Sequence, residues 1–150
     1  SGYSRAAVYF AKNHQFDKAE QYAKKARAFI DNDIRLTEFY VTYYIEKGEL
    51  DKLDAFIENN IWGNADEISI YRAYVLRYVM ENRRDLAPRY LAKIMTRYPD
   101  DPDLGAIALA YGYQYKQMAQ INALFDSLRD ILHYTPEDIY RSIQEEMSPE

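Results

Sequence analysis

The feature that most constrains the fold of this chain is a short motif that recurs at a fixed distance. Residues 16–19 read Phe-Asp-Lys-Ala, and residues 50–53 read Leu-Asp-Lys-Leu, 34 positions further on. A constant step of this length indicates that the chain repeats one structural unit. Three other sets of residues keep the same step: the small or apolar Ala19, Leu53 and Ala87, the aromatic Phe10, Tyr44 and Tyr78, and the turn candidates His14, Gly48 and Asn82.

Within each repeat, the apolar residues follow the spacing of an amphipathic helix. Ala7 and Phe10 fall on one face of a first helix, and Ala19 and Ala23 fall on one face of a second. The polar stretch at residues 13–15 separates them, so we expect an antiparallel helix pair. The sequence has no sustained alternation of apolar and polar residues and no Asn-Gly or Asp-Gly hairpin turn, so no strand is predicted.

Glycine, proline and capping residues predict where the helices begin and end. Gly48 is expected to end one helix, because glycine readily takes the left-handed conformation. Asn64 is expected to cap another, with Glu67 returning the hydrogen bond in a capping box. Pro88 belongs in the first turn of a helix, and Asp101 followed by proline marks a further helix start.

The last part of the chain departs from the strict step. The first-helix residues of a fourth pair, from Leu104 to Tyr111, fit the pattern only after a shift of one position. We therefore expect the turn of this pair to be lengthened. A final short helix is predicted from Pro136 to about Met147, with acidic residues in its first turn.

The 34-residue helix–turn–helix period resembles the tetratricopeptide repeat (TPR). The third repeat carries Tyr71, Tyr78, Ala87 and Pro99 where that family has two aromatic residues, alanine and proline, and the second repeat keeps the turn glycine Gly48. The resemblance implies an all-α fold, a right-handed superhelical stack of about three to four antiparallel helix pairs. The implied repeats are residues 1–33, 34–67, 68–101 and 102–134, followed by a capping helix and an acidic tail at residues 135–150.

Composition and charge argue against several functional classes. The net charge is −5, which disfavours nonspecific binding to nucleic acid. No apolar run is long enough to span a bilayer. The chain has no cysteine, two histidines, no His-Glu-x-x-His motif and no glycine-rich phosphate loop, so we expect no catalytic activity, no metal and no cofactor.

The resemblance implies that the first helices line a concave groove that binds a peptide or protein segment. Apolar groups flanked by charges suit peptide recognition, because the apolar groups anchor the peptide and the charges fix its register. The opposing interpretation is that the apolar candidates are buried between helices. The groove candidates are Arg5, Val8, Lys12, Glu38, Phe39, Thr42, Ile45, Glu46, Arg72, Leu76, Val79, Met80 and Tyr113.

A second candidate surface is a basic ridge made by Arg89, Lys93 and Arg97, which recur every four residues. Such a ridge suits an acidic peptide or an anionic polymer, but a charge run of this kind is more often a solvated outer face.

Three functions follow from these observations, and the leading hypothesis is a protein–protein interaction scaffold. The first alternative is a TPR segment of a larger bacterial envelope or polysaccharide-export assembly, which would contact a partner subunit or an anionic polymer. The second alternative is a secretion chaperone for an apolar segment. The sequence does not specify a compartment, and the start at Ser-Gly suggests a domain excised from a larger protein.

Overall fold

The computed structural model describes residues 2–29, 34–59 and 65–147, and these ranges contain helices and their connections but no strand. The predicted all-α class is therefore confirmed. The chain divides into two compact units, Ser1–Val75 and Leu76–Glu150, and each is described by itself.

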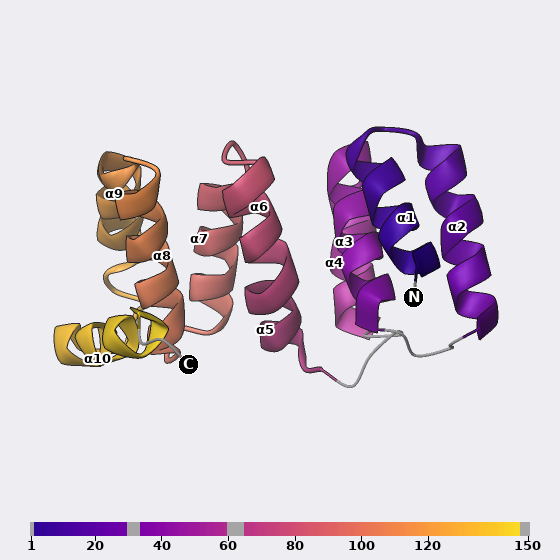
Figure 1. Ribbon diagram of the computed structural model, residues 1–150. Coiled ribbons are helices and arrows are strands. Elements are labelled where there is room, and N and C mark those ends of the chain that lie inside the picture. The colour runs from indigo at the N-terminus through magenta and orange to yellow at the C-terminus, as the bar shows by residue number, and fades with distance from the viewer. Residues whose placement is uncertain (1, 30–33, 60–64, 148–150) are drawn as a thin grey trace. The chain divides into compact units, whose positions relative to one another are not determined.

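The first unit contains two helix pairs and the start of a third (Figure 1). Helix α1 packs against both α2 and α3, and α3 packs against α4. Small residues make this close approach possible, because Ala7 and Ala11 of α1 and Ala19 of α2 are completely buried. The helices of this unit are α1 (Gly2–Lys12), α2 (Phe16–Phe29), α3 (Ile34–Lys47), α4 (Leu50–Asn59) and α5 (Glu67–Ile70).

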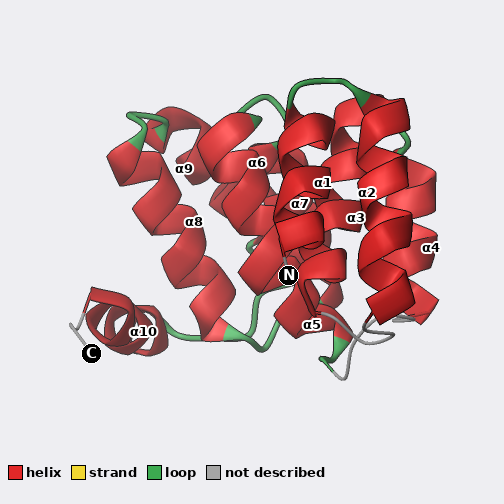
Figure 2. Ribbon diagram, turned by 45° about the vertical axis from the view of Figure 1, so that its right-hand side comes forward, coloured by secondary structure: helices red, strands yellow, loops and turns green. Residues whose placement is uncertain are grey.

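The second unit is arranged around α8, which packs against α7, α9 and α10. In both Figure 1 and Figure 2, the axis of α10 lies across that of α8 rather than alongside it. The predicted final helix is thus present and covers part of α8. The helices of this unit are α6 (Arg77–Asn82), α7 (Ala87–Arg97), α8 (Pro102–Gln114), α9 (Met118–Leu128) and α10 (Pro136–Met147).

The turn of three helix pairs has the same backbone geometry at the same position of the repeat. Gly48 has φ of 73°, and His14 and Lys116 have φ of 60° and 56°, in the left-handed region. After each of them, an N–H donates to the carbonyl five residues earlier, as in a Schellman motif. These bonds join Gln15 N to Phe10 O at 2.9 Å, Glu49 N to Tyr44 O at 2.8 Å and Gln117 N to Gly112 O at 2.8 Å.

The recurrence of this turn corrects two predictions. Lys116 lies 68 positions after Gly48, twice the repeat step, so the fourth turn is not lengthened. The third turn is the irregular one, because Asn82 is the last residue of α6 and residues 83–86 connect it to α7. There Arg83 N donates to Val79 O at 2.8 Å, four residues back, and no left-handed residue occurs.

The start of the third pair differs from the predicted capping box. Asp66, not Asn64, caps α5, and its carboxylate accepts a hydrogen bond from Ser69 N at 2.9 Å. Glu67 is therefore the first helical residue and cannot return the capping bond, while Asn64 lies outside the described residues. The helix then passes through a π-helical segment, Tyr71–Leu76, before α6.

The other predicted helix starts are confirmed. Pro88 occupies the first turn of α7, and Asp101 caps α8 by accepting a hydrogen bond from Asp103 N at 2.9 Å. At α10, Thr135 and Asp138 form a reciprocal capping box, with Thr135 N to Asp138 Oδ2 at 2.9 Å and Asp138 N to Thr135 Oγ1 at 3.1 Å.

Candidate functional site

Four of the apolar groove candidates, together with the polar Thr42, are in the protein interior. In the first unit, Phe39, Thr42 and Ile45 have exposed fractions of 1%, 1% and 0%. In the second unit, Leu76 and Val79 have exposed fractions of 1% and 0%. The expectation that these five residues are exposed in a groove is wrong, because the faces that carry them are the faces by which the helices pack.

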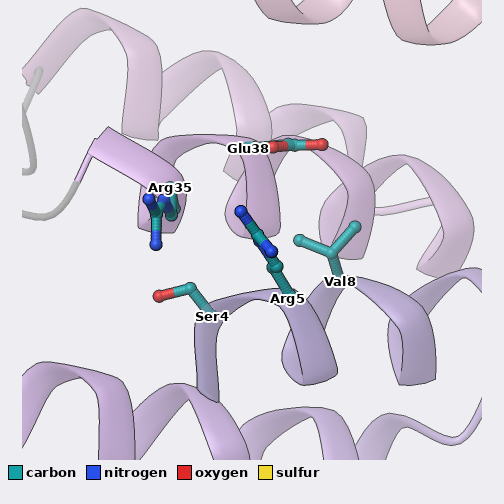
Figure 3. Close-up of a pocket in the computed structure, with 5 residues that line it drawn as sticks. All are labelled: Ser4, Arg5, Val8, Arg35 and Glu38. Carbon is teal, nitrogen blue, oxygen red and sulfur yellow. The ribbon is translucent and has the colours of Figure 1, made fainter. Parts of the chain in front are cut away.

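The polar candidates near the start of the chain do come together. A hollow of about 300 Å³ lies between α1 and α3 and is lined by Ser4, Arg5, Val8, Arg35 and Glu38 (Figure 3). Its volume is at the lower end of the range for ligand pockets, roughly 300–1,000 Å³. Because α1 and α3 are the first helices of their pairs, the hollow lies on the helices that were predicted to line the groove.

The helical spacing explains which side chains reach this hollow. Ser4 and Val8 lie one turn apart on α1, and Arg35 and Glu38 lie one turn apart on α3. Ser4 is completely buried, whereas Arg5 and Glu38 are exposed and Val8 is half-buried. Figure 3 shows Ser4, Arg5 and Val8 projecting from one helix and Arg35 and Glu38 from the other.

The chemistry of this hollow suits binding. Two guanidinium groups, one carboxylate and the methyl groups of Val8 line it together. Arginine forms charge-assisted hydrogen bonds with carboxylates and phosphates, often through two parallel N–H donors. The arrangement can hold an acidic group beside a small apolar contact.

Two lining residues were not among the groove candidates. Arg35 lies three residues before Glu38, so helical spacing from Glu38 would have identified it. Ser4 gives no such signal, because a small polar residue on a helix is more often exposed or a cap than the buried lining of a hollow.

A second, more open hollow of about 390 Å³ lies at the turn between α1 and α2. His14 at this turn places its Nε2 2.8 Å from Oε2 of Glu46, one of the groove candidates on α3. This contact links the turn of the first helix pair to α3 of the second pair. This hollow is lined by His14, Gln15, Phe16, Asp17 and Lys18.

The remaining candidates are dispersed. Lys12 is exposed in the last turn of α1, and Arg72 and Met80 are half-buried in the first and second units. Tyr113 on α8 is 84% exposed, although its repeat counterparts Ala11, Ile45 and Val79 are completely buried.

The basic ridge lies on α7, opposite the buried face of that helix. Arg89 and Arg97 are exposed, and Lys93 is half-buried. The buried face consists of Ala87, Tyr90, Leu91, Ile94 and Met95.

Two further features bear on the class of site. The described residues contain no group of three or more His, Cys, Asp or Glu side chains placed to hold a metal ion. None of the helices in the described ranges is both long and apolar enough to cross a membrane.

No protein-family model, curated protein or solved structure matches this chain.

Proposed function

We propose that this protein is a non-catalytic interaction module of the TPR type, which binds an acidic segment of another protein across α1 and α3. The observation that carries this proposal is the hollow between these helices, with Arg5 and Arg35 at its wall and Val8 beside them. An acidic side chain would accept hydrogen bonds from the guanidinium groups, and a neighbouring apolar side chain would contact Val8.

The recurrence of the turn supports the TPR-type assignment. Three left-handed turn residues separated by multiples of 34 positions fit a chain of similar helix pairs. Repeats of this kind pack against their neighbours and form extended concave binding surfaces. The burial of Phe39, Ile45 and Val79 agrees with such packing and gives less support to a chaperone for apolar segments.

A peptide array tests the proposal even while the partner is unidentified. We expect the full chain to select peptides in which Asp or Glu lies next to an apolar residue. Charge reversal of Arg5 to Glu should weaken binding of a selected peptide at least about tenfold, because a like charge replaces a favourable one. Arg89→Glu, at an exposed arginine on α7, is the matched control and should leave the affinity unchanged.

Two results would contradict the proposal. One is an array without any preference for acidic peptides, and the other is an equal loss of binding in Arg5→Glu and Arg89→Glu.

The alternative of an anionic polymer bound at the basic ridge rests on the exposure of Arg89 and Arg97. Titration with an acidic polysaccharide would support it if the double variant Arg89→Glu, Arg97→Glu lost binding and Arg5→Glu did not. Equal binding by all variants would assign these arginines to a solvated surface.

A further inference from the structure

The second helices of the first two pairs each present a carboxylate to a tyrosine of a later helix. The hydroxyl of Tyr43 on α3 donates a hydrogen bond to Oε1 of Glu20 on α2. The hydroxyl of Tyr71 donates to Oδ1 of Asp54 on α4 at 3.2 Å. Glu20 and Asp54 are 34 positions apart, so the same position of the repeat carries a carboxylate that accepts a hydrogen bond from a tyrosine in both helix pairs.

The side chains around Tyr43 show which groups bury a tyrosine at this position of the repeat. Its ring meets the ring of Phe16 edge-on, with centroids 5.7 Å apart and planes at 83°. Phe16 and Glu20 are four residues apart and share one face of α2. Tyr43 is only 6% exposed, and the ring of Phe39 also stacks on it with centroids 5.2 Å apart. An apolar residue and a carboxylate one turn later therefore form a socket for this tyrosine.

Tyr9 on α1 is the repeat counterpart of Tyr43, with the same residue type 34 positions earlier. It is nevertheless 60% exposed, and its ring contacts that of Phe10, the next residue of the same helix, at 5.3 Å. Arg5 and Lys12 lie about one turn before and after it, and both are exposed. The outer face of α1, made by Arg5, Tyr9 and Lys12, thus carries a tyrosine between two cations.

We propose that the outer face of α1 docks an acidic amphipathic helix from another protein, which presents an apolar residue and a carboxylate one turn later. The ring of Tyr9 packs on the apolar residue and its hydroxyl donates to the carboxylate, as Tyr43 does with Phe16 and Glu20. Arg5 and Lys12 select a helix of net negative charge. Arg5 belongs to both this face and the peptide-binding hollow, whereas Tyr9 and Lys12 do not line the hollow, so variants of Tyr9 test this docking separately.

Helix α4 supplies a probe of the required chemistry. Leu50 and Asp54 hold the same repeat positions as Phe16 and Glu20, and residues 50–59 carry three carboxylates against one lysine. A stapled helical peptide of this sequence, fluorescently labelled, is titrated with the full chain. We expect saturable binding that Tyr9→Ala in the protein abolishes. Asp54→Asn in the peptide should weaken it about tenfold, because the Tyr9 hydroxyl then donates to a neutral amide oxygen instead of a carboxylate.

The controls separate this face from other sites. Tyr140 on α10 is 62% exposed, so Tyr140→Ala is a matched change that should leave binding unaltered. Tyr9→Phe retains the ring and should reproduce the weakening seen with Asp54→Asn. Absence of binding at millimolar peptide, or equal affinity for Tyr9→Ala and the parent chain, would overturn the proposal. So would self-association in sedimentation that Tyr9→Ala abolishes, because a second copy would then occupy the face.

Discussion

At the scale of single residues, the contact between Gly105 and Tyr134 shows how closely the second unit is packed. A Cβ at position 105 would lie 3.0 Å from Cε2 and 3.1 Å from Oη of Tyr134. Replacing glycine by alanine within a helix normally stabilises it by roughly 1 kcal/mol. Here we expect Gly105→Ala to lower the free energy of unfolding by about 1–3 kcal/mol, because the ring must move. Urea denaturation measures this, and the same change in a Tyr134→Ala background should be neutral or stabilising.

The hydroxyl of Tyr134 leads to a prediction about pH. It is buried without a hydrogen-bond partner among the described residues, and burial raises its pKa to about 12 from the usual 10.0. Because the folded state holds this proton more tightly than the unfolded state, its contribution to stability is complete below pH 10 and is lost between pH 10 and about 12. Tyr134→Phe should therefore lose less stability than the parent chain in this interval. Denaturant titrations at pH 9 and about 11.5 measure the free energy of unfolding of both proteins. If it fell by the same amount in Tyr134→Phe and in the parent chain, this assignment would be contradicted.

At the scale of elements, the recurring turn predicts opposite effects of glycine at equivalent positions. Lys116 has a left-handed backbone, so Lys116→Gly should raise the free energy of unfolding by roughly 0.5–1 kcal/mol. Asn82 holds the same repeat position but ends α6, and its side chain donates to Tyr78 O at 3.1 Å. Asn82→Gly should lower stability by about 1 kcal/mol, since it removes this bond and weakens the helix. Chemical denaturation of both variants tests whether the third turn lacks the left-handed backbone of the other turns.

The same elements show what could be predicted from the sequence. Helix starts at Pro88, Asp101 and Pro136 were predictable, because capping depends on residues within one turn. The left-handed turn at Lys116 was missed, because lysine has no preference for that conformation and Tyr111 suggested a shifted register. Burial of Phe39 depends on neighbouring helices that are distant in sequence, so helical spacing alone could not distinguish a groove from a core.

At the scale of the whole molecule, the division into Ser1–Val75 and Leu76–Glu150 predicts that stability is not uniform along the chain. In repeat proteins, stability is approximately a sum of contributions from units and their nearest neighbours. A cavity in one unit should therefore affect hydrogen exchange mainly in that unit. Leu53 and Leu91 are both completely buried, one in each unit, so their replacement by alanine gives a matched pair.

Each leucine substitution should cost about 2–5 kcal/mol in its own unit, because it removes buried methyl groups and leaves a cavity. We expect Leu53→Ala to reduce amide protection within Ser1–Val75 and Leu91→Ala to reduce it within Leu76–Glu150. Native-state hydrogen exchange resolved by residue makes the measurement. If either variant lowered protection equally throughout the chain, the molecule would unfold as one cooperative body.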